Sequence, residues 1–229
     1  SDLSTGLEIY LRLVLAGKGD PVNTERAAAL LAASTVHMPT EARAALLVME
    51  GAPAEGGAMP EPLPLLVSES TPLTRAALVS ILNDAAQLRL RGSVPLAEAV
   101  LAQSEQDPLL VAASIDVLLS VAPERAEGAW IRAFDAESAE YADRLRLALL
   151  AIEARDSTDG VLKHLAASDD AILGALGRAA IGVRTNDPEP ALALVTTKYT
   201  QALAWLIDET KVMDPTTAER VLLAIIDLT

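Results

Sequence analysis

The sequence of 229 residues contains no cysteine, only two histidines and few aromatic residues. Without cysteine the chain has no disulfides, no thiol nucleophile and no thiolate metal site. Aromatic residues make up 3% of the chain although 51% of its residues are hydrophobic, so the core must consist of Ala, Leu, Val and Ile. Sequence rich in Ala and Leu favours helices, and the scarcity of alternating or β-branched runs argues against a sheet.

Basic residues are also few, with 18 Lys and Arg against 32 Asp and Glu and a net charge of −14. An acidic protein repels phosphate backbones, so we expect no nucleic-acid partner, and a HEAT-like DNA glycosylase conflicts with this charge. No apolar run approaches the ~18 residues of a membrane span, so we expect no membrane insertion. The chain starts at Ser1 rather than Met, which is compatible with a soluble cytoplasmic protein or a periplasmic one whose signal has been removed.

The motifs of common enzyme classes are missing as well. GxSxG, GxGxxG and the P-loop pattern do not occur, and neither His37 nor His164 belongs to an HExxH pair. The acidic run at residues 156–160 resembles a calcium loop, but its glycine is one position early and Ala167 stands where the loop needs glutamate. We therefore predict no catalytic residues, no metal ligands and no cofactor.

The clearest structural pattern lies at residues 107–135. Asp107 followed by Pro108 is typical of a helix start, because the carboxylate accepts from free N–H groups and proline suits the first helical position. Apolar residues then recur every three or four positions, which is one face of a helix. After Pro123 a second helix carries Trp130 and Phe134 on a stripe with alanines, and we interpret both rings as core fillers. Two such helices would pack against each other.

Similar patterns recur along the chain, and Thr71, Asp107, Ser138 and Asp169 open comparable segments at separations of 36, 31 and 31 residues. Such spacing is typical of helical repeats. Asp–Pro pairs at 187–188 and 214–215 predict further helix starts. Ser168 or Asp169 is the expected cap of another helix, whose apolar face runs from Ile172 to Val183. The other predicted helices span residues 4–15, 24–33, 41–50, 74–90, 94–103, 137–155 (the longest), 161–167 and 201–209. The spacing of the helix at 137–155 places Tyr141 on its apolar face, so Trp130, Phe134 and Tyr141 fall near one helix junction.

Two stretches resemble the second half of a HEAT-type repeat: QDPLLVAASIDVLLSV at 106–121 and SDDAILGALGRAAIGV at 168–183. The resemblance covers about residues 72–183, and it departs from the family pattern where Leu or Ile replaces a basic residue early in the inner helix. It implies an all-α protein, a right-handed α-solenoid of short antiparallel helix pairs that binds protein partners. A tetratricopeptide-like repeat is the second alternative, although its Trp-Leu-Gly-Tyr signature is absent.

Domain organisation is predicted as a single helical repeat domain over residues 1–229. Residues 51–71 interrupt the pattern with seven Gly and Pro residues, which forbid a regular helix through most of the segment. This segment is either a surface connection that separates residues 1–50 from 72–229, or a docking segment with Leu63, Leu65, Leu66 and Val67 as its apolar part. A third alternative is that these four residues start a short helix that packs against the rest of the domain.

Two aromatic residues near the C-terminus, Tyr199 and Trp205, are further interface candidates because such residues are enriched at binding surfaces. The predicted function is a non-catalytic scaffold or adaptor that binds a protein or peptide. The alternative is the helical accessory or catalytic domain of an enzyme acting on a polysaccharide or small metabolite, which requires a deep pocket with two carboxylates or a histidine. The predicted partner-binding residues are Leu63, Leu65, Leu66, Tyr199 and Trp205.

Overall fold

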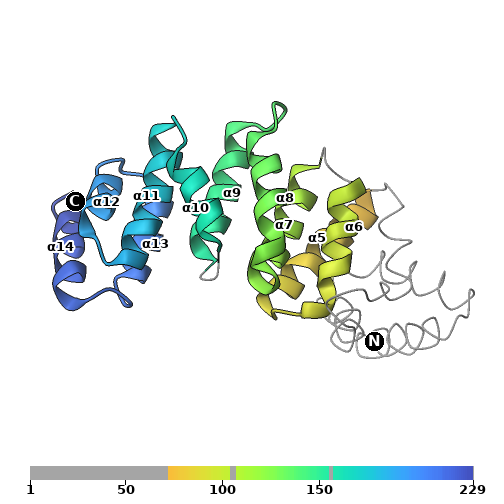
Figure 1. Ribbon diagram of the computed structural model, residues 1–229, viewed down its shortest axis with the longest axis horizontal. Coiled ribbons are helices and arrows are strands. Elements are labelled where there is room, and N and C mark those ends of the chain that lie inside the picture. Colours follow the sequence, from red (N-terminus) through yellow and green to blue (C-terminus); the bar gives the residue numbers. More distant parts are fainter. Residues whose placement is uncertain (1–71, 104–106, 155–156, 229) are drawn as a thin grey trace, which may run out of the picture. The chain divides into compact units, whose positions relative to one another are not determined.

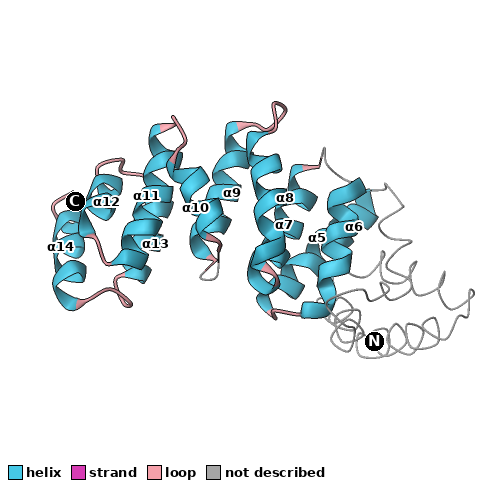
Figure 2. Cartoon of the chain, viewed as in Figure 1, coloured by secondary structure: helices cyan, strands magenta, loops and turns pink. Residues whose placement is uncertain are grey.

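A computed structural model describes residues 72–103, 107–154 and 157–228 of the chain. These residues form helices joined by short turns, and Figure 2 shows no strand among them. The prediction of an all-α protein is therefore confirmed. The helices predicted within residues 1–50, and the irregular segment at 51–71, lie outside the described residues.

The helices follow one another along the chain with few residues between them (Figure 1). They are α5 (Pro72–Gln87), the 3-10 helix η1 (Arg91–Ser93), α6 (Val94–Gln103), α7 (Pro108–Val121), α8 (Pro123–Asp135), α9 (Tyr141–Glu153), α10 (Asp159–Ala166), α11 (Ala171–Thr185), α12 (Pro188–Val195), α13 (Thr200–Glu209) and α14 (Pro215–Ile226).

The chain divides into two compact units, and the division falls within α8, between Ala129 and Trp130. Each unit is therefore described by itself. No helix in the described part of the chain is both long and apolar enough to cross a membrane.

The described part of the first unit is built around α7, which packs against α5 and α6. Nine of its fourteen residues are buried, and the side chains of Ile115 and Val117 are fully enclosed. Asp107 starts the helix as predicted, because its carboxylate accepts from the backbone N–H groups of Leu109 and Leu110 at 3.1 and 3.3 Å. Arg75 of α5 forms an ion pair with the same carboxylate, so the cap also links two helices.

The second unit is built around α11, which packs against α9, α10 and α12. Its buried residues include Gly174, Gly177 and Gly182. A Cβ atom on Gly177 would lie 2.3 Å from the backbone nitrogen of Ala166 in α10, and one on Gly174 would lie 2.6 Å from the carbonyl oxygen of Ser168. The backbones of α10 and α11 therefore approach so closely that only glycine fits at the contact.

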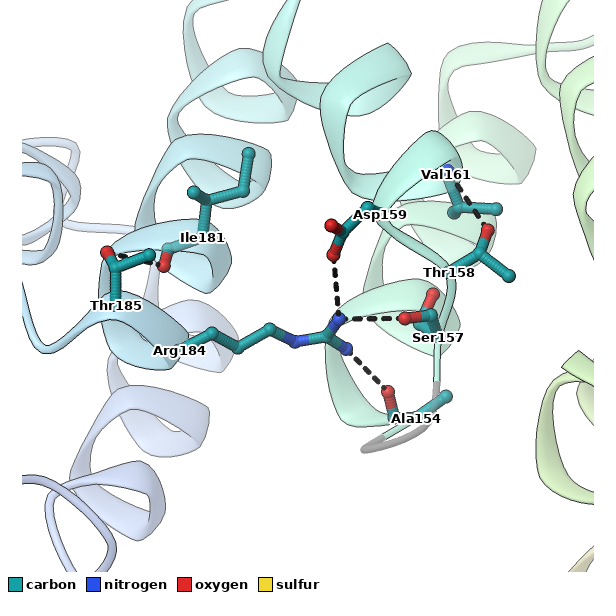
Figure 3. Close-up of polar contacts among 8 residues, drawn as sticks. All are labelled: Ala154, Ser157, Thr158, Asp159, Val161, Ile181, Arg184 and Thr185. Carbon is teal, nitrogen blue, oxygen red and sulfur yellow. Dashed lines mark hydrogen bonds and ion pairs between the residues drawn. The ribbon is translucent and has the colours of Figure 1, made fainter.

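Two arginines of α11 complete this contact by donating to carbonyl groups at the ends of neighbouring helices. Arg178 Nη1 donates to the Ala166 carbonyl at the end of α10, at 3.0 Å. Arg184 donates from Nη1 to the Ser157 carbonyl at 2.7 Å and from Nη2 to the Ala154 carbonyl at 3.3 Å, beside the carboxylate of Asp159 (Figure 3). The last carbonyls of a helix lack partners within it, so Arg178 satisfies one at the end of α10 and Arg184 satisfies one at the end of α9.

The turn before α12 is joined to the start of α14. Asn186 ends α11 in the left-handed region, with φ of 57°, and its amide donates to the Asp214 carboxylate while its Oδ1 accepts from the backbone N–H of Asp214. Asp214 also caps α14 by accepting from Thr216 and Thr217. Hydrogen bonds from the Thr217 side chain and backbone, then from Asn186, lower the pKa of Asp214 to about 2.

Two details of the predicted helices are wrong. The helix expected over residues 137–155 begins only at Tyr141, because Ala136–Ala139 form a turn and Glu140 is extended. The longest described helix is α5, with 16 residues. The buried side chains of α9 are Leu147, Ala148, Ala151 and Ile152, whereas Tyr141, placed on the inner face by its spacing, is exposed.

Side-chain contacts between separate helices recur at similar separations along the chain. The pairs Arg75–Asp107, Asp135–His164 and Asn186–Asp214 lie 32, 29 and 28 residues apart. Arg184–Ser157 and Arg220–Glu189 lie 27 and 31 residues apart. This spacing is close to the 31 residues predicted between helix starts. The right-handed solenoid and the pairing of its repeats stay predictions.

Candidate functional site

An open cavity of about 620 Å³ lies in the second unit, where the end of α8, the start of α9, the end of α10 and the start of α11 come together. We call it the α8–α11 cleft. Its volume is that of a site for a small molecule or for a few side chains of a partner. The lining residues are Phe134, Asp135, Tyr141, Arg144, His164, Ala167, Ser168, Asp169, Asp170 and Leu173.

Aromatic packing forms the rigid side of the cleft. The rings of Trp130 and Phe134 stack with centroids 4.6 Å apart and an angle of 15° between their planes. Trp130 is fully buried, and its indole Nε1 donates to the Leu147 carbonyl of α9 at 2.9 Å. Both rings are core residues, in agreement with the filler interpretation, and Phe134 also lines the cleft.

His164 of α10 lies edge-on to both rings, with centroids 6.1 Å from Trp130 and 6.0 Å from Phe134. Its Nε2 lies 3.0 Å from Oδ1 of Asp135, the last residue of α8. Because an ionised carboxylate only accepts, Nε2 carries the hydrogen in this pair. The contact holds the imidazole in one orientation at the wall of the cleft and links α10 to α8.

The turn between α10 and α11 supplies the acidic side of the cleft. Asp170 is the N-cap of α11, and its Oδ1 accepts from the backbone N–H groups of Ile172 and Leu173 at 3.0 and 2.9 Å. The expectation that Ser168 or Asp169 caps this helix is wrong by one or two residues. Ser168 Oγ instead accepts from the backbone N–H of Asp170 at 3.3 Å, which fixes the turn.

Asp169, between these two residues, is exposed and forms no hydrogen bond or ion pair with the described part of the chain. Its carboxylate is therefore available to a ligand, whereas those of Asp135 and Asp170 already accept hydrogen bonds from the protein.

Two residues of α9, Tyr141 and Arg144, line the remaining side of the cleft. Tyr141 is 47% exposed at the rim. Partial burial raises its pKa, and the carboxylate of Asp170 and the phenol of Tyr199 raise it further. Arg144 donates from Nη2 to the Ala136 carbonyl at 3.2 Å, while its Nε is buried and has no acceptor among the described residues.

These positions suit binding better than nucleophilic chemistry. Ser168 Oγ and His164 Nε2 are each engaged with another group, so the two do not form a nucleophile and base directed at each other. In the described ranges, no three or more His, Asp or Glu side chains are grouped so that they could hold a metal ion. What the cleft offers a ligand is the free carboxylate of Asp169 and the exposed phenol ring of Tyr141.

The predicted partner-binding residues are only partly described. Leu63, Leu65 and Leu66 lie outside the described residues. Trp205 of α13 is only 8% exposed, so its ring packs within the second unit, and its indole nitrogen has no acceptor among the described residues. Tyr199 precedes α13, is partly exposed and hydrogen-bonds to Gln201. Neither Tyr199 nor Trp205 is among the residues that line the α8–α11 cleft.

None of the residues that line the cleft was predicted to bind a partner, and Asp135, His164 and Asp169 are the polar ones that matter most here. Sequence reasoning noted of His164 only that it belongs to no HExxH pair. The separation of 29 residues between Asp135 and His164, close to the predicted repeat, is a signal that could have paired them. The grouping of Trp130, Phe134 and Tyr141 near one helix junction did mark the correct place.

Comparisons with protein-family models, with curated proteins and with solved structures each found no match for this chain. The HEAT-like assignment therefore stays a prediction. The function must be inferred from the chemistry of the cleft itself.

Proposed function

We propose that this protein is a non-catalytic adaptor, built on an α-helical repeat, that binds a protein partner through the α8–α11 cleft. The observation that carries this proposal is the open cavity with exposed Tyr141 and Asp169 at its surface, between four helices that are fixed by buried contacts. Rigid elements that present an aromatic ring and a free charge are typical of binding sites.

Two further features support a scaffold. Polar contacts between helices recur 27 to 32 residues apart, as neighbouring repeats of a helical array would make them. Most polar groups of the cleft bind other parts of the protein, which holds the surface in one shape. A pre-formed surface binds with little loss of conformational entropy.

The test is capture of partners by the full chain from extracts of the source cells. Tyr141→Ala removes an exposed ring, so it should leave the fold intact, as circular dichroism will check. Leu109→Ala is the control, because Leu109 is similarly exposed but lies on α7 in the first unit. We expect a specific partner that the wild type and Leu109→Ala retain and Tyr141→Ala loses. Equal retention by all three proteins contradicts binding at the cleft.

The second candidate is an enzyme acting on a polysaccharide or small metabolite. The specific observation in its favour is the His164–Asp135 pair at the wall of a 620 Å³ cavity, because a histidine oriented by a carboxylate can act as a base. The test is turnover of a panel of polysaccharides and metabolites by the wild type and by His164→Gln. Turnover that His164→Gln abolishes without unfolding favours the enzyme over the adaptor.

A further inference from the structure

Carboxylates outnumber cations around the α8–α11 cleft. Asp135, Asp169 and Asp170 line it, against Arg144 and His164. Both basic side chains donate to groups of the protein, whereas the carboxylate of Asp169 has no partner among the described residues. The interaction still open to a ligand at this surface is therefore with a cation.

The cleft also offers apolar area beside the charge. That area is the ring of Tyr141, which is exposed at the rim, because Phe134 and Leu173, which line the cavity from α8 and α11, are themselves buried. Lysine and arginine side chains match this combination, because they lay an aliphatic stem along apolar surface while their charged end reaches a carboxylate. An aromatic ring adds attraction for such a cation.

We infer that the α8–α11 cleft recognises a basic segment of the partner and seats a lysine or arginine side chain between Tyr141 and Asp169. This inference rests on the proposed adaptor function and names the chemistry of its partner. The guanidinium or ammonium group pairs with Asp169, and the stem lies against Tyr141.

A peptide fits this site better than a free polyamine. Arg144 lines the cavity, and the acceptor found for its guanidinium among the described residues is the Ala136 carbonyl, at Nη2. A polypeptide supplies backbone carbonyl acceptors as well as a cation, whereas a polyamine supplies only donors. A carbonyl oxygen that accepts from another N–H group of this guanidinium would add to the affinity.

An anionic segment is disfavoured at the same place. The N-terminus of α11 would attract an anion, but the carboxylate of Asp170 already occupies it. Asp169 repels a second negative charge there. The net charge of −14 acts in the same direction over longer distances, because it attracts basic partners and slows the approach of acidic ones.

The test is a titration of the full chain with labelled peptides at about 0.15 M salt, where the Debye length is about 8 Å and distant charges are screened. The basic probe is Gly-Ser-Gly-Arg-Lys-Arg-Gly-Ser-Gly. Its neutral counterpart carries citrulline for arginine and acetyl-lysine for lysine, so shape and length are kept and charge is removed. Spermidine serves as a cation without a peptide backbone. Fluorescence anisotropy reports binding.

We expect the basic peptide to bind at least tenfold more tightly than the neutral one, since a hydrogen bond to a charged group contributes a factor on the order of ten or more. Asp169→Lys should weaken binding by a similar factor and Asp169→Asn by less. Asp208→Lys is the matched control: it makes the same charge change on exposed α13, outside the cleft, and should change affinity less than about threefold.

Three results overturn the inference. Equal affinity for the neutral peptide shows that the site does not recognise the positive charge. Equal losses of affinity in Asp169→Lys and Asp208→Lys show that only the net charge of the protein matters. Competition by spermidine at the concentration of the peptide shows that no backbone is needed. If Tyr141→Ala still abolishes partner capture while basic peptides fail to bind, the adaptor function stands and only the basic segment is wrong.

Discussion

Among the described helices of their units, α7 and α11 have the most buried residues, and they achieve burial by opposite means. The nine buried residues of α7 are almost all Ala, Val, Leu and Ile, which fill space between α5 and α6. The eight buried residues of α11 include three glycines, which bring its backbone against α10. A helix packed through its side chains loses stability when a buried side chain is replaced by a smaller one. A helix packed through its backbone loses stability when a glycine at the contact is replaced by any larger residue.

The close backbone packing of α11 also fixes one side of the α8–α11 cleft. Gly177 and Arg178 hold α11 to the end of α10, so the turn at residues 167–170 is fixed in position. That turn carries Asp169, which lines the same cavity as Tyr141 at the start of α9. The described surface of α7 offers no comparable arrangement, because its cap residue Asp107 is paired with Arg75.

The largest effect is expected in α7. Ile115→Ala removes a fully buried side chain and should lower the free energy of unfolding by about 2–5 kcal/mol, because transfer energy is lost and a cavity remains. Ile115→Val is the control and should cost about 0.5–1.5 kcal/mol. Denaturant unfolding followed by circular dichroism measures both. Similar values for the two variants contradict packing by side-chain volume.

The second effect tests backbone packing in α11. Gly177→Ala raises helix propensity, yet its new methyl group would overlap the backbone of Ala166, so we expect a net loss of about 1–3 kcal/mol. Gly128→Ala is the matched control, since Gly128 is exposed on α8 and should gain up to about 1 kcal/mol. If Gly177→Ala is as stable as Gly128→Ala, the close approach of α10 and α11 is wrong.

The smallest effect concerns the cap that joins α14 to the end of α11. The pKa of Asp214, about 2, lies below its ordinary value of 3.8, so the unfolded chain binds more protons between these values. The contribution of Asp214 to stability is therefore present above about pH 4 and is lost as the pH falls through about 2. Asp214→Asn should flatten the dependence of the melting temperature on pH in this window.

Asp208→Asn is the control for that experiment, because it makes the same charge change on α13 without a cap. It should leave the slope of melting temperature against pH between 2 and 4 as in the wild type. An unchanged slope in Asp214→Asn, or an equal change in both variants, contradicts the assignment of this proton uptake to Asp214.

Sequence reasoning succeeded where the signal is local. The Asp–Pro starts of α7, α12 and α14 were all predicted, because a cap and a proline act on the first turn whatever surrounds it. The core positions of Trp130 and Phe134 also followed from helical spacing. These features depend on neighbours three or four residues away.

The rest depends on contacts between distant residues, which periodicity does not specify. The glycines of α11 were read only as small residues of a helix, since their close approach to Ala166 exists only after α10 and α11 pack. The pairing of Asp135 with His164 across 29 residues is of the same kind. Trp205 was chosen for its residue type, but the packing of α13 buries it.

The central claim is that the α8–α11 cleft, rather than α7 or its neighbours, binds the partner. Hydrogen–deuterium exchange of the full chain with and without the captured partner tests it directly. We expect new protection in residues 135–145 and 164–173 and little change in residues 94–121. Protection confined to residues 94–121, with none around the cleft, would contradict the account.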